Sequence, residues 1–386
     1  MNELAEWKET AILEIIDIIG GGTPKTSIAD YWNGEIPWLS VKDFNNDNRY
    51  VYDTEKHISD LGLNNSSTKL LQRDDIIISA RGTVGEIAMI PYPMAFNQSC
   101  YGIRAKAGTD KAFLYYLLKY KIADLKRMTH GSVFDTITRD TFANLIVSLP
   151  PYEIQRRIAS VLMLIDDKIE CNSRINDNLA ELLQTVYQER FGDVSAATEQ
   201  GMLSDICSYS RDRVAVSELN ASTYFSTENM LPGKAGATEA ASLPTIPQTT
   251  ACHKGDTLIS NIRPYFKKIV YCEDRCGCST DVLCFTPVQP KYAAYLFSTL
   301  YADKFFAFMV AGSKGTKMPR GDKQQIMAYP VALPSDEELD EFNKLALPIL
   351  AQLHSNKAEN KRLSATRDAL LPKLMSGEID VSAIQL

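Results

Sequence analysis

Apolar residues recur at alternating intervals of three and four in two segments of the chain, and both segments share one spacing. In the first segment, Glu153 to Arg190, the positions on this seam are Ile158, Leu162, Ile165, Ile169, Asn172, Asn176, Leu179, Leu183, Val186 and Arg190. The same steps displaced by 184 residues give Phe342, Ala346, Ile349, Leu353, Asn356, Asn360, Leu363, Arg367, Leu370 and Leu374. This is the pattern of the seam between paired helices. The sequence therefore predicts two long helices in one register.

Four asparagines interrupt the apolar seam, namely Asn172, Asn176, Asn356 and Asn360. A buried Asn in a helix seam lowers stability but fixes the register, because a misaligned pairing leaves its amide without a partner. If the two helices pair antiparallel, the asparagines face one another. The alternative is two separate amphipathic core helices. Pro348 and Pro372 each remove an intrahelical hydrogen bond, so we expect the second helix to run unbroken only between them.

The remainder of the chain also repeats, with offsets of about 180 to 184 residues. Asp256 to Ser260 matches Asp75 to Ser79, and both read as buried strands. The first strand leads through Arg81-Gly82-Thr83 into a second apolar run, which predicts a hairpin with a cation at its tip. A further strand is expected from Phe96 to Ile103. The pattern is typical of two divergent copies of one α/β fold.

Composition places limits on the function. The 386 residues are enough for two or three domains. No apolar run reaches the ~18 residues of a membrane span, and we expect a cytoplasmic protein. The eight Cys are too sparse for a disulfide framework. Four of them, in the pattern C-x3-C-x-C-x5-C from Cys272, do not form paired C-x2-C units, so we expect buried thiols and no metal site.

The charge distribution limits the kind of nucleic-acid surface that the chain can offer. The net charge is −7, which argues against a broad basic face. Residues 201–333 are nevertheless net positive, while the helical segments are acidic. We therefore expect a polyanion to meet local cationic patches.

Two strings resemble catalytic motifs but lack an essential feature. Gly20 to Thr26 reads GGGTPKT, yet a phosphate-binding P-loop needs Gly-Lys-Ser/Thr at the start of a helix, and Pro24 precedes the lysine here. Leu149-Pro150-Pro151-Tyr152 resembles the Asn/Asp-Pro-Pro-Tyr motif of amino-group DNA methyltransferases, but Leu149 cannot accept a hydrogen bond from a base. We interpret it as the proline-marked start of a helix.

Almost the whole chain resembles the DNA-specificity subunits of type I restriction-modification systems. The resemblance rests on the order of seven segments, which are 21–44 (GGTPKTSIADYWNGEIPWLSVKDF), 78–90 (ISARGTVGEIAMI), 96–106 (FNQSCYGIRAK), 149–187, 224–236 (YFSTENMLPGKAG), 312–334 and 367–381 (RDALLPKLMSGEIDV). It implies an α+β fold with pseudo-two-fold symmetry, in which two target-recognition domains are separated by an antiparallel coiled coil. The expected divisions are a first recognition domain at 1–150, a first spacer helix at 151–191, a second recognition domain at 192–333, and a second spacer helix and tail at 334–386.

The resemblance also implies partners and a role. The two domains would each read one half of an asymmetric bipartite site in double-stranded DNA. Modification subunits, expected in two copies, would dock on the helices and bring S-adenosylmethionine, and restriction (translocase-nuclease) subunits would bring ATP and Mg. This chain itself would be non-catalytic and hold no cofactor. The alternatives are a self-contained DNA methyltransferase or nuclease, and a coiled-coil scaffold without a DNA role.

Candidate DNA contacts are side chains that can reach base edges or phosphates from loops. In the first domain they are Gly22, Thr23, Lys25, Ser40, Lys42, Arg81, Gly82, Thr83, His130 and Ser132. In the second they are Ser226, Thr227, Ser260, Arg263, Lys314, Lys317 and Arg320. Exposed cations are usually only solvated and Gly-rich turns usually only turn, so each of these residues is a hypothesis.

Overall fold

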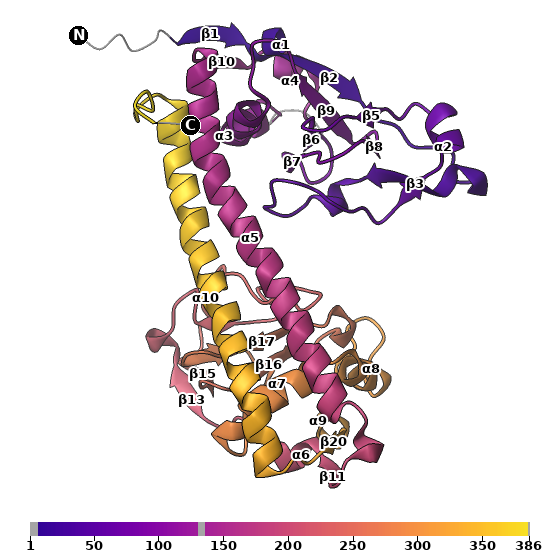
Figure 1. Ribbon diagram of the computed structural model, residues 1–386, viewed down its shortest axis with the longest axis vertical. Coiled ribbons are helices and arrows are strands. Elements are labelled where there is room, and N and C mark those ends of the chain that lie inside the picture. The colour runs from indigo at the N-terminus through magenta and orange to yellow at the C-terminus, as the bar shows by residue number, and fades with distance from the viewer. Residues whose placement is uncertain (1–6, 130–135, 385–386) are drawn as a thin grey trace. The chain divides into compact units, whose positions relative to one another are not determined.

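The computed structural model describes residues 7–129 and 136–384. Internal contacts divide the chain into two compact units, in which unit 1 comprises Met1–Cys171 with Glu359–Leu386 and unit 2 comprises Asn172–Ala358. Two helices of 40 residues each contribute to both units: α5 (Tyr152–Phe191) and α10 (Asp336–Met375) (Figure 1). Each unit therefore combines a strand-rich fold with one stretch of each long helix.

Unit 1 contains three sheets. Strand β1 (Lys8–Ala11) pairs antiparallel with β10 (Ile146–Leu149). An antiparallel sheet has the order β2-β9-β6-β7, with the bounds Ile16–Gly20, Cys100–Ala105, Ile76–Ser79 and Ile87–Met89. The third sheet has the order β4-β3-β8-β5, with the bounds His57–Ile58, Trp32–Leu39, Met94–Phe96 and Leu70–Leu71. In it β3 and β8 are parallel.

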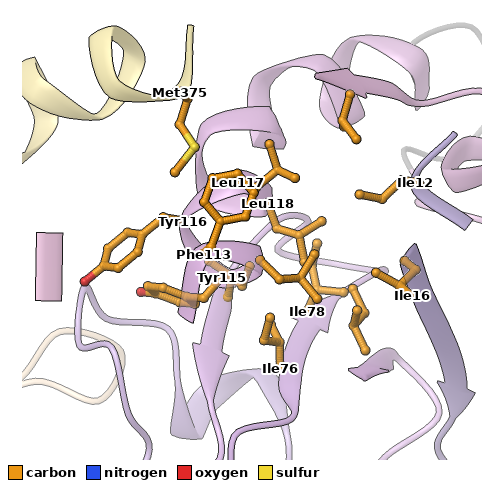
Figure 2. Packing of buried hydrophobic residues seen from close by; sticks show 14 of the residues in the cluster. Ile12, Ile16, Ile76, Ile78, Phe113, Tyr115, Tyr116, Leu117, Leu118 and Met375 are labelled. Atoms are coloured by element: carbon orange, nitrogen blue, oxygen red, sulfur yellow. The ribbon is translucent and has the colours of Figure 1, made fainter. Parts of the chain in front are cut away.

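The core of unit 1 lies between the β2-β9-β6-β7 sheet and helix α3 (Lys111–Thr129). Alternate residues of β6 face opposite sides, so Ile76 and Ile78 pack toward α3 while Ile77 joins a second apolar cluster. Figure 2 shows Met375 of α10 beside the side chains of α3, above the isoleucines of the sheet. The short helices α1 (Ile12–Ile15), α2 (Asp60–Asn64) and α4 (Arg139–Ala143) complete the described part of the unit.

Unit 2 also contains three sheets. Strand β11 (Gln200–Met202) pairs antiparallel with β20 (Pro330–Ala332). An antiparallel sheet has the order β12-β19-β16-β17, with the bounds Cys207–Tyr209, Val282–Pro287, Thr257–Ser260 and Ile269–Tyr271. The third sheet has the order β13-β15-β18-β14, with the bounds Arg213–Ala215, Gln248–Cys252, Cys276–Cys278 and Tyr224–Phe225. In it β14 and β18 are parallel.

The α-helices that lie wholly within unit 2 are α6 (Leu203–Ile206), α7 (Ala293–Tyr301), α8 (Asp303–Ala311) and α9 (Lys323–Met327). Helices α7 and α8 lie at the place in the sequence that α3 occupies in unit 1. The extended backbone of Ala302, with φ −64° and ψ 141°, separates them. Buried Tyr295, Phe305 and Phe306 contribute large side chains to this core.

The connectivity of the two units confirms the predicted tandem repeat. The order β2-β9-β6-β7 corresponds strand for strand to β12-β19-β16-β17. In each third sheet, a central strand has one parallel and one antiparallel neighbour: β8 lies between β3 and β5, and β18 lies between β14 and β15. The fourth strand differs, because β4 joins the parallel neighbour β3, whereas β13 joins the antiparallel neighbour β15. The two units therefore share a core of strands but differ in the position of one outer strand.

The two long helices run antiparallel within each unit. In unit 2, Asn356 Nδ2 donates to Asn176 Oδ1 at 2.9 Å, and Arg190 pairs with Glu341 at 3.2 Å. Asn172 in the same unit is only 1% exposed. In unit 1, Asn360 Nδ2 donates to the carbonyl of Ile169 at 3.2 Å. Asn172, Asn176 and Asn356 thus lie at buried positions of paired helices, as their spacing predicts, and Asn360 is half-buried.

Two details of the sequence prediction were wrong. Helix α10 continues past both prolines, because Pro348 and Pro372 are exposed and water can hydrate the carbonyl groups that they leave free. The strand expected from Phe96 to Ile103 is two strands, β8 and β9, in different sheets, separated by a turn at residues 97–99. The polar side chains in this interval favour the turn.

Candidate nucleic-acid interface

In unit 1 the predicted contact loops gather around the turn at residues 97–99. The backbone N–H of Asn97 donates to the carbonyl of Leu39, next to Ser40, at 3.0 Å. The N–H of Gly22 donates to Phe96, and that of Ala80, next to Arg81, donates to Ser99. Three loops that are distant in sequence therefore meet at one edge of the fold.

In the glycine-rich loop at residues 20–26, Gly22 is buried and supports the fold, whereas Lys25 is exposed. Gly22 is buried, and a Cβ there would lie 2.3 Å from Ser67 Oγ and 2.4 Å from the backbone N of Thr68. Gly22 thus permits close packing and does not present a surface, which corrects its interpretation as a contact. The Thr23 hydroxyl bonds to the exposed Gln98. Lys25 is exposed and remains a candidate contact.

The loop after β3 uses its serine internally. The backbone N and hydroxyl of Ser40 both bond to Asp43 Oδ2, at 2.7 and 2.9 Å, and close the short 3-10 helix Val41–Asp43. Because this hydroxyl already has a partner, we assign Ser40 a supporting role. The Lys42 side chain is 78% exposed, and its ammonium lies 4.0 Å from Glu55. A weak surface pair of this kind leaves the lysine able to contact phosphate.

The predicted hairpin between β6 and β7 is present, and its tip is open to solvent. Arg81, Gly82 and Thr83 are all exposed, and Gly82 has a positive φ of 78°. Ser79 Oγ holds the turn by donating to the carbonyl of Thr83 at 2.5 Å. The Arg81 side chain has no hydrogen bond or ion pair with any residue in the described ranges. His130 and Ser132 lie outside the described residues.

Unit 2 repeats this arrangement around residues 279–281. The N–H of Ser279 donates to Phe225, next to Ser226, and the N–H of Asn261 donates to Asp281, both at 2.8 Å. The hydroxyl groups of Thr227 and Ser260 lie 3.0 Å apart. Ser260 is only 2% exposed. It therefore supports Thr227 and cannot itself reach a base, which corrects its interpretation as a contact.

The cationic loop of unit 2 packs against the β16–β17 connection. Backbone hydrogen bonds of 2.9 Å join Lys314 and Arg320 in both directions, and the N–H of Arg263 donates to Pro319 at 2.8 Å. Lys314 pairs with Asp322, and Arg320 pairs with Asp281 at 3.0 Å. The exposed side chains of Arg263 and Lys317 have no such partner among the described residues. The structure thus brings the predicted cations of this domain together.

Sequence reasoning missed exposed apolar residues in the same place. Tyr265 and Phe266 are 50% and 39% exposed, and Met318 is 51% exposed. The string from Asn261 to Lys268, NIRPYFKK, places two aromatic residues between cations, which is a signal for nucleic-acid binding that could have been read. Lys268 donates to the carbonyl of Thr227 at 2.6 Å, and burial lowers the pKa of its ammonium group.

Comparison with known proteins relates the chain to one family. Residues 5–181 match the family model described as "Type I restriction modification DNA specificity domain". The type I restriction enzyme MjaIX specificity subunit of Methanocaldococcus jannaschii is 25% identical over 410 residues, which cover 98% of this chain and 95% of the relative. Residues 5–181 thus match the specificity-domain family, and almost the whole chain is similar to a type I restriction-modification specificity subunit.

One further relative is a specificity subunit, and one solved structure shares the fold. The EcoR124I/EcoR124II specificity subunit of Escherichia coli is 29% identical over 169 residues, which cover 42% of this chain and 41% of the relative. A solved S subunit from M. genitalium has the same fold, with a TM-score of 0.58 and 17% identity over 97% of both chains. The predicted architecture of two mixed α/β folds with long helices is confirmed.

The methyltransferase-like string of this specificity subunit has a structural role. Leu149 ends β10 and pairs with Lys8 of β1. The two prolines then lead into α5, and the carbonyl of Pro151 accepts hydrogen bonds from Ile154 and Gln155 at 2.9 and 3.0 Å. The predicted helix start is confirmed. Because the relatives are specificity subunits, the assignment agrees with the expectation of a non-catalytic chain.

Five of the six cysteines of unit 2 share one apolar cluster, and the sixth, Cys207, lies in the larger core. Cys252, Cys272, Cys276, Cys278 and Cys284 are all buried, and the Cys276 thiol lies 3.6 Å from Cys272 Sγ. Within residues 7–129 and 136–384, no group of three or more His, Cys, Asp or Glu side chains is arranged to hold a metal ion. No helix in the described part of the chain has the length and apolar character to cross a membrane.

Proposed function

We propose that this specificity subunit selects an asymmetric bipartite site in double-stranded DNA and brings modification and restriction subunits to it. The observation that carries the proposal is the repeated gathering of exposed cations around equivalent turns, at residues 97–99 in unit 1 and 279–281 in unit 2. Each unit would read one short half-site from these loops. The two units differ in the position of one outer strand and in the sequences of their loops, so the half-sites would differ as well.

Few cations are available for phosphate contacts. Lys25, Lys42 and Arg81 are exposed in unit 1, and Arg263 and Lys317 are exposed and unpaired among the described residues of unit 2. Each neutralised phosphate adds to affinity by releasing counterions. With so few contacts and a net charge of −7, binding by this chain alone would be weak. Partner subunits would therefore supply further contacts with DNA.

Exposed apolar residues on the long helices support docking of two modification subunits. In unit 1, Leu164 of α5 is 70% exposed, and Val161 and Met163 beside it are half-buried. The residues 184 positions further along the chain are Leu345, Leu347 and Pro348 of α10 in unit 2. Leu345 and Leu347 are 39% and 45% exposed. Each unit thus carries one apolar patch at equivalent helix positions. Such patches mark interaction sites, and two equivalent sites suit two copies of one partner.

The chemistry would belong to the partners. Modification subunits would bind S-adenosylmethionine, restriction subunits would bind ATP and Mg, and this chain would hold neither. Its own residues would choose where on the DNA the partners act. Localisation in the cytoplasm, where such a complex meets DNA, follows from the same proposal.

Mapping of methylated bases tests the proposal directly. Genomes of cells that express a modification subunit with or without this chain would be compared by sequencing that detects methylated bases. We expect methylation at one asymmetric bipartite sequence only when the chain is present. Methylation that is independent of the chain, or methyl transfer by the purified chain alone, would overturn the proposal. A mobility-shift measurement with genomic DNA would separate it from a scaffold without a DNA role.

A further inference from the structure

The connection between β16 and β17 presents two aromatic rings, packed as a tilted pair, to solvent. Tyr265 and Phe266 lie in the 3-10 helix Pro264–Phe266, with ring centroids 4.7 Å apart and the ring planes inclined by 55°. Both are exposed while Pro264 is buried. Large aromatic side chains usually bury most of their surface. Their exposure at the tip of a hairpin therefore calls for a ligand.

The backbone of this aromatic turn, residues 263–267, is strained and held firmly. Arg263 and Lys267 both adopt left-handed conformations, each with a φ of 51°. This conformation is costly for residues other than Gly and concentrates at functional sites. Backbone hydrogen bonds brace the turn, since Gly233 N–H donates to Phe266 and Lys234 N–H donates to Lys267, at 2.8 and 2.9 Å. The turn thus holds its two rings in place before any ligand arrives.

Side chains around the turn are mostly cationic. Arg263 is exposed and has no polar partner among the described residues. Lys267 and Lys234 both pair with Asp303, at 2.9 and 2.8 Å, and lower the pKa of its carboxyl group to about 2. Lys317 is exposed in the adjoining loop, which the Arg263 to Pro319 hydrogen bond joins to the turn. Unpaired cations beside exposed rings match a partner that combines phosphates with flat apolar faces.

Exposed rings lie beside unpaired cations at this turn. From this arrangement we infer that Tyr265 and Phe266 form an aromatic wedge, which enters a base-pair step of the half-site that unit 2 reads (the second half-site) and packs against the unstacked bases. The inference rests on the proposed function and extends it from loop contacts to deformation of the DNA. Apolar wedges unstack a step and bend the duplex. Pyrimidine–purine steps deform most easily. Part of the sequence preference at this half-site would therefore come from the ease with which one step opens.

The test uses the reconstituted complex of this chain with its modification subunit and a DNA site that the wild-type complex methylates. The adenine analogue 2-aminopurine, whose fluorescence rises on unstacking, is placed at successive steps of the second half-site. We expect a fluorescence increase at one step with the wild-type chain and none with the double variant Tyr265→Ala and Phe266→Ala. Loss of base stacking should weaken binding by about tenfold to a hundredfold.

Matched variants separate stacking from charge and from folding. Val288→Ala removes an equally exposed apolar side chain of unit 2, 50% exposed, and should bind as the wild type does. Tyr265→Phe keeps the ring and should retain the fluorescence signal. The aromatic double variant should leave the salt dependence of binding unchanged, whereas Arg263→Ala and Lys317→Ala should each reduce its slope by roughly one.

Three outcomes would overturn the inference. The first is a wild-type complex that methylates its site but raises fluorescence at no step of the second half-site. The second is full affinity in the double alanine variant. The third is a double variant that binds DNA normally but no longer joins the modification subunit, which would assign the rings to a protein interface. Absence of any methylated site would instead contradict the proposed function, and the inference would fall with it.

Discussion

Arg367 donates a hydrogen bond to Asp166 at 2.9 Å inside the helix pair of unit 1, where the two residues are 3% and 6% exposed. The helix positions related to them by the 184-residue displacement are Leu183 and Leu350 in unit 2, and both are buried in an apolar cluster. The same position of the repeat is therefore ionic in one unit and apolar in the other.

Replacement of one member of this pair should be costly. Arg367→Leu leaves the buried Asp166 without its guanidinium partner, and we expect a loss of about 3–5 kcal/mol in the free energy of unfolding. The double variant Asp166→Leu with Arg367→Leu reproduces the composition of unit 2 and should recover most of this loss. Denaturant unfolding measures both. A single variant as stable as the wild type would contradict this account.

The asparagine pair in unit 2 should show the same kind of coupling. Asn356→Leu leaves the buried Asn176 amide oxygen without its donor, which we expect to cost about 1–3 kcal/mol. The double variant with Asn176→Leu should be at least as stable as the wild type but should lose the constraint on register. A double-mutant cycle of unfolding free energies, with interhelix cross-linking as the measure of register, checks both statements. Additive effects of the two substitutions would refute the coupling.

Acid should weaken the contact between Asp47 and its two cations. Burial acts to raise the pKa of Asp47, but Lys119 and Arg367 outweigh it and lower the pKa below its usual range. A lowered carboxyl pKa contributes stability above the unfolded value of about 3.9, and this is lost as the pH falls through the folded value. Asp47→Asn should therefore cost about 1 kcal/mol or less near pH 7. The difference from the wild type should vanish in acid, as measured by unfolding at several pH values.

Lengthening of both helices should change the DNA spacer and leave the half-sites unchanged. Seven residues inserted after Cys171 in α5 and after Ala358 in α10 keep the seam in phase and add ~10 Å of helix. At ~3.4 Å per base pair, the spacer should grow by about three base pairs. Methylation mapping of the variant checks this. An insertion in α5 alone should abolish helix pairing, and altered half-site bases with an unchanged spacer would show that the helices do not set the distance.

A charge placed on either of the two apolar helix patches, at Leu164 or at Leu347, should prevent the docking of one modification subunit. Leu164→Glu and Leu347→Glu bring a carboxylate into the proposed docking surfaces, and desolvation of that charge should weaken docking at least tenfold. Native mass spectrometry should find one modification subunit in place of two for either variant. Leu182→Glu is the control, because Leu182 is 46% exposed, close to the 45% of Leu347, but its counterpart Thr366 is polar. Two bound copies in every variant would place the docking surface elsewhere.

Features carried by periodicity could be read from the sequence. The heptad seam predicted α5, α10 and the burial of Asn172, because repetition over many turns averages out local exceptions. The strand equivalence of Ile76 and Thr257 followed from two similar strings in one order. Details that depend on single contacts were harder. The burial of Ser260 arises from its place between β17 and β19, and no local pattern distinguishes it from an exposed serine.

In the candidate site, too, the features that repeat in the sequence could be predicted and the features that depend on single contacts could not. Arg81 and Arg263 follow equivalent buried strands, so their loops could be found by matching the repeats. The turn at residues 97–99 and the exposure of Phe266 could not, because they depend on which loops meet in three dimensions. The persistence of α10 through Pro348 was mispredicted because the solvation of a freed carbonyl depends on which face of the helix the proline occupies.

The placement of strands β4 and β13 on opposite flanks of otherwise matching sheets bears on how such proteins diversify. An outer strand can be gained, lost or moved without rebuilding the layer behind it, since only one neighbour has to accept it. The side of each unit that packs on the long helices would stay unchanged while the outer strand and its loops change. New DNA sequence preferences could then arise without altering the surfaces to which the partner subunits bind.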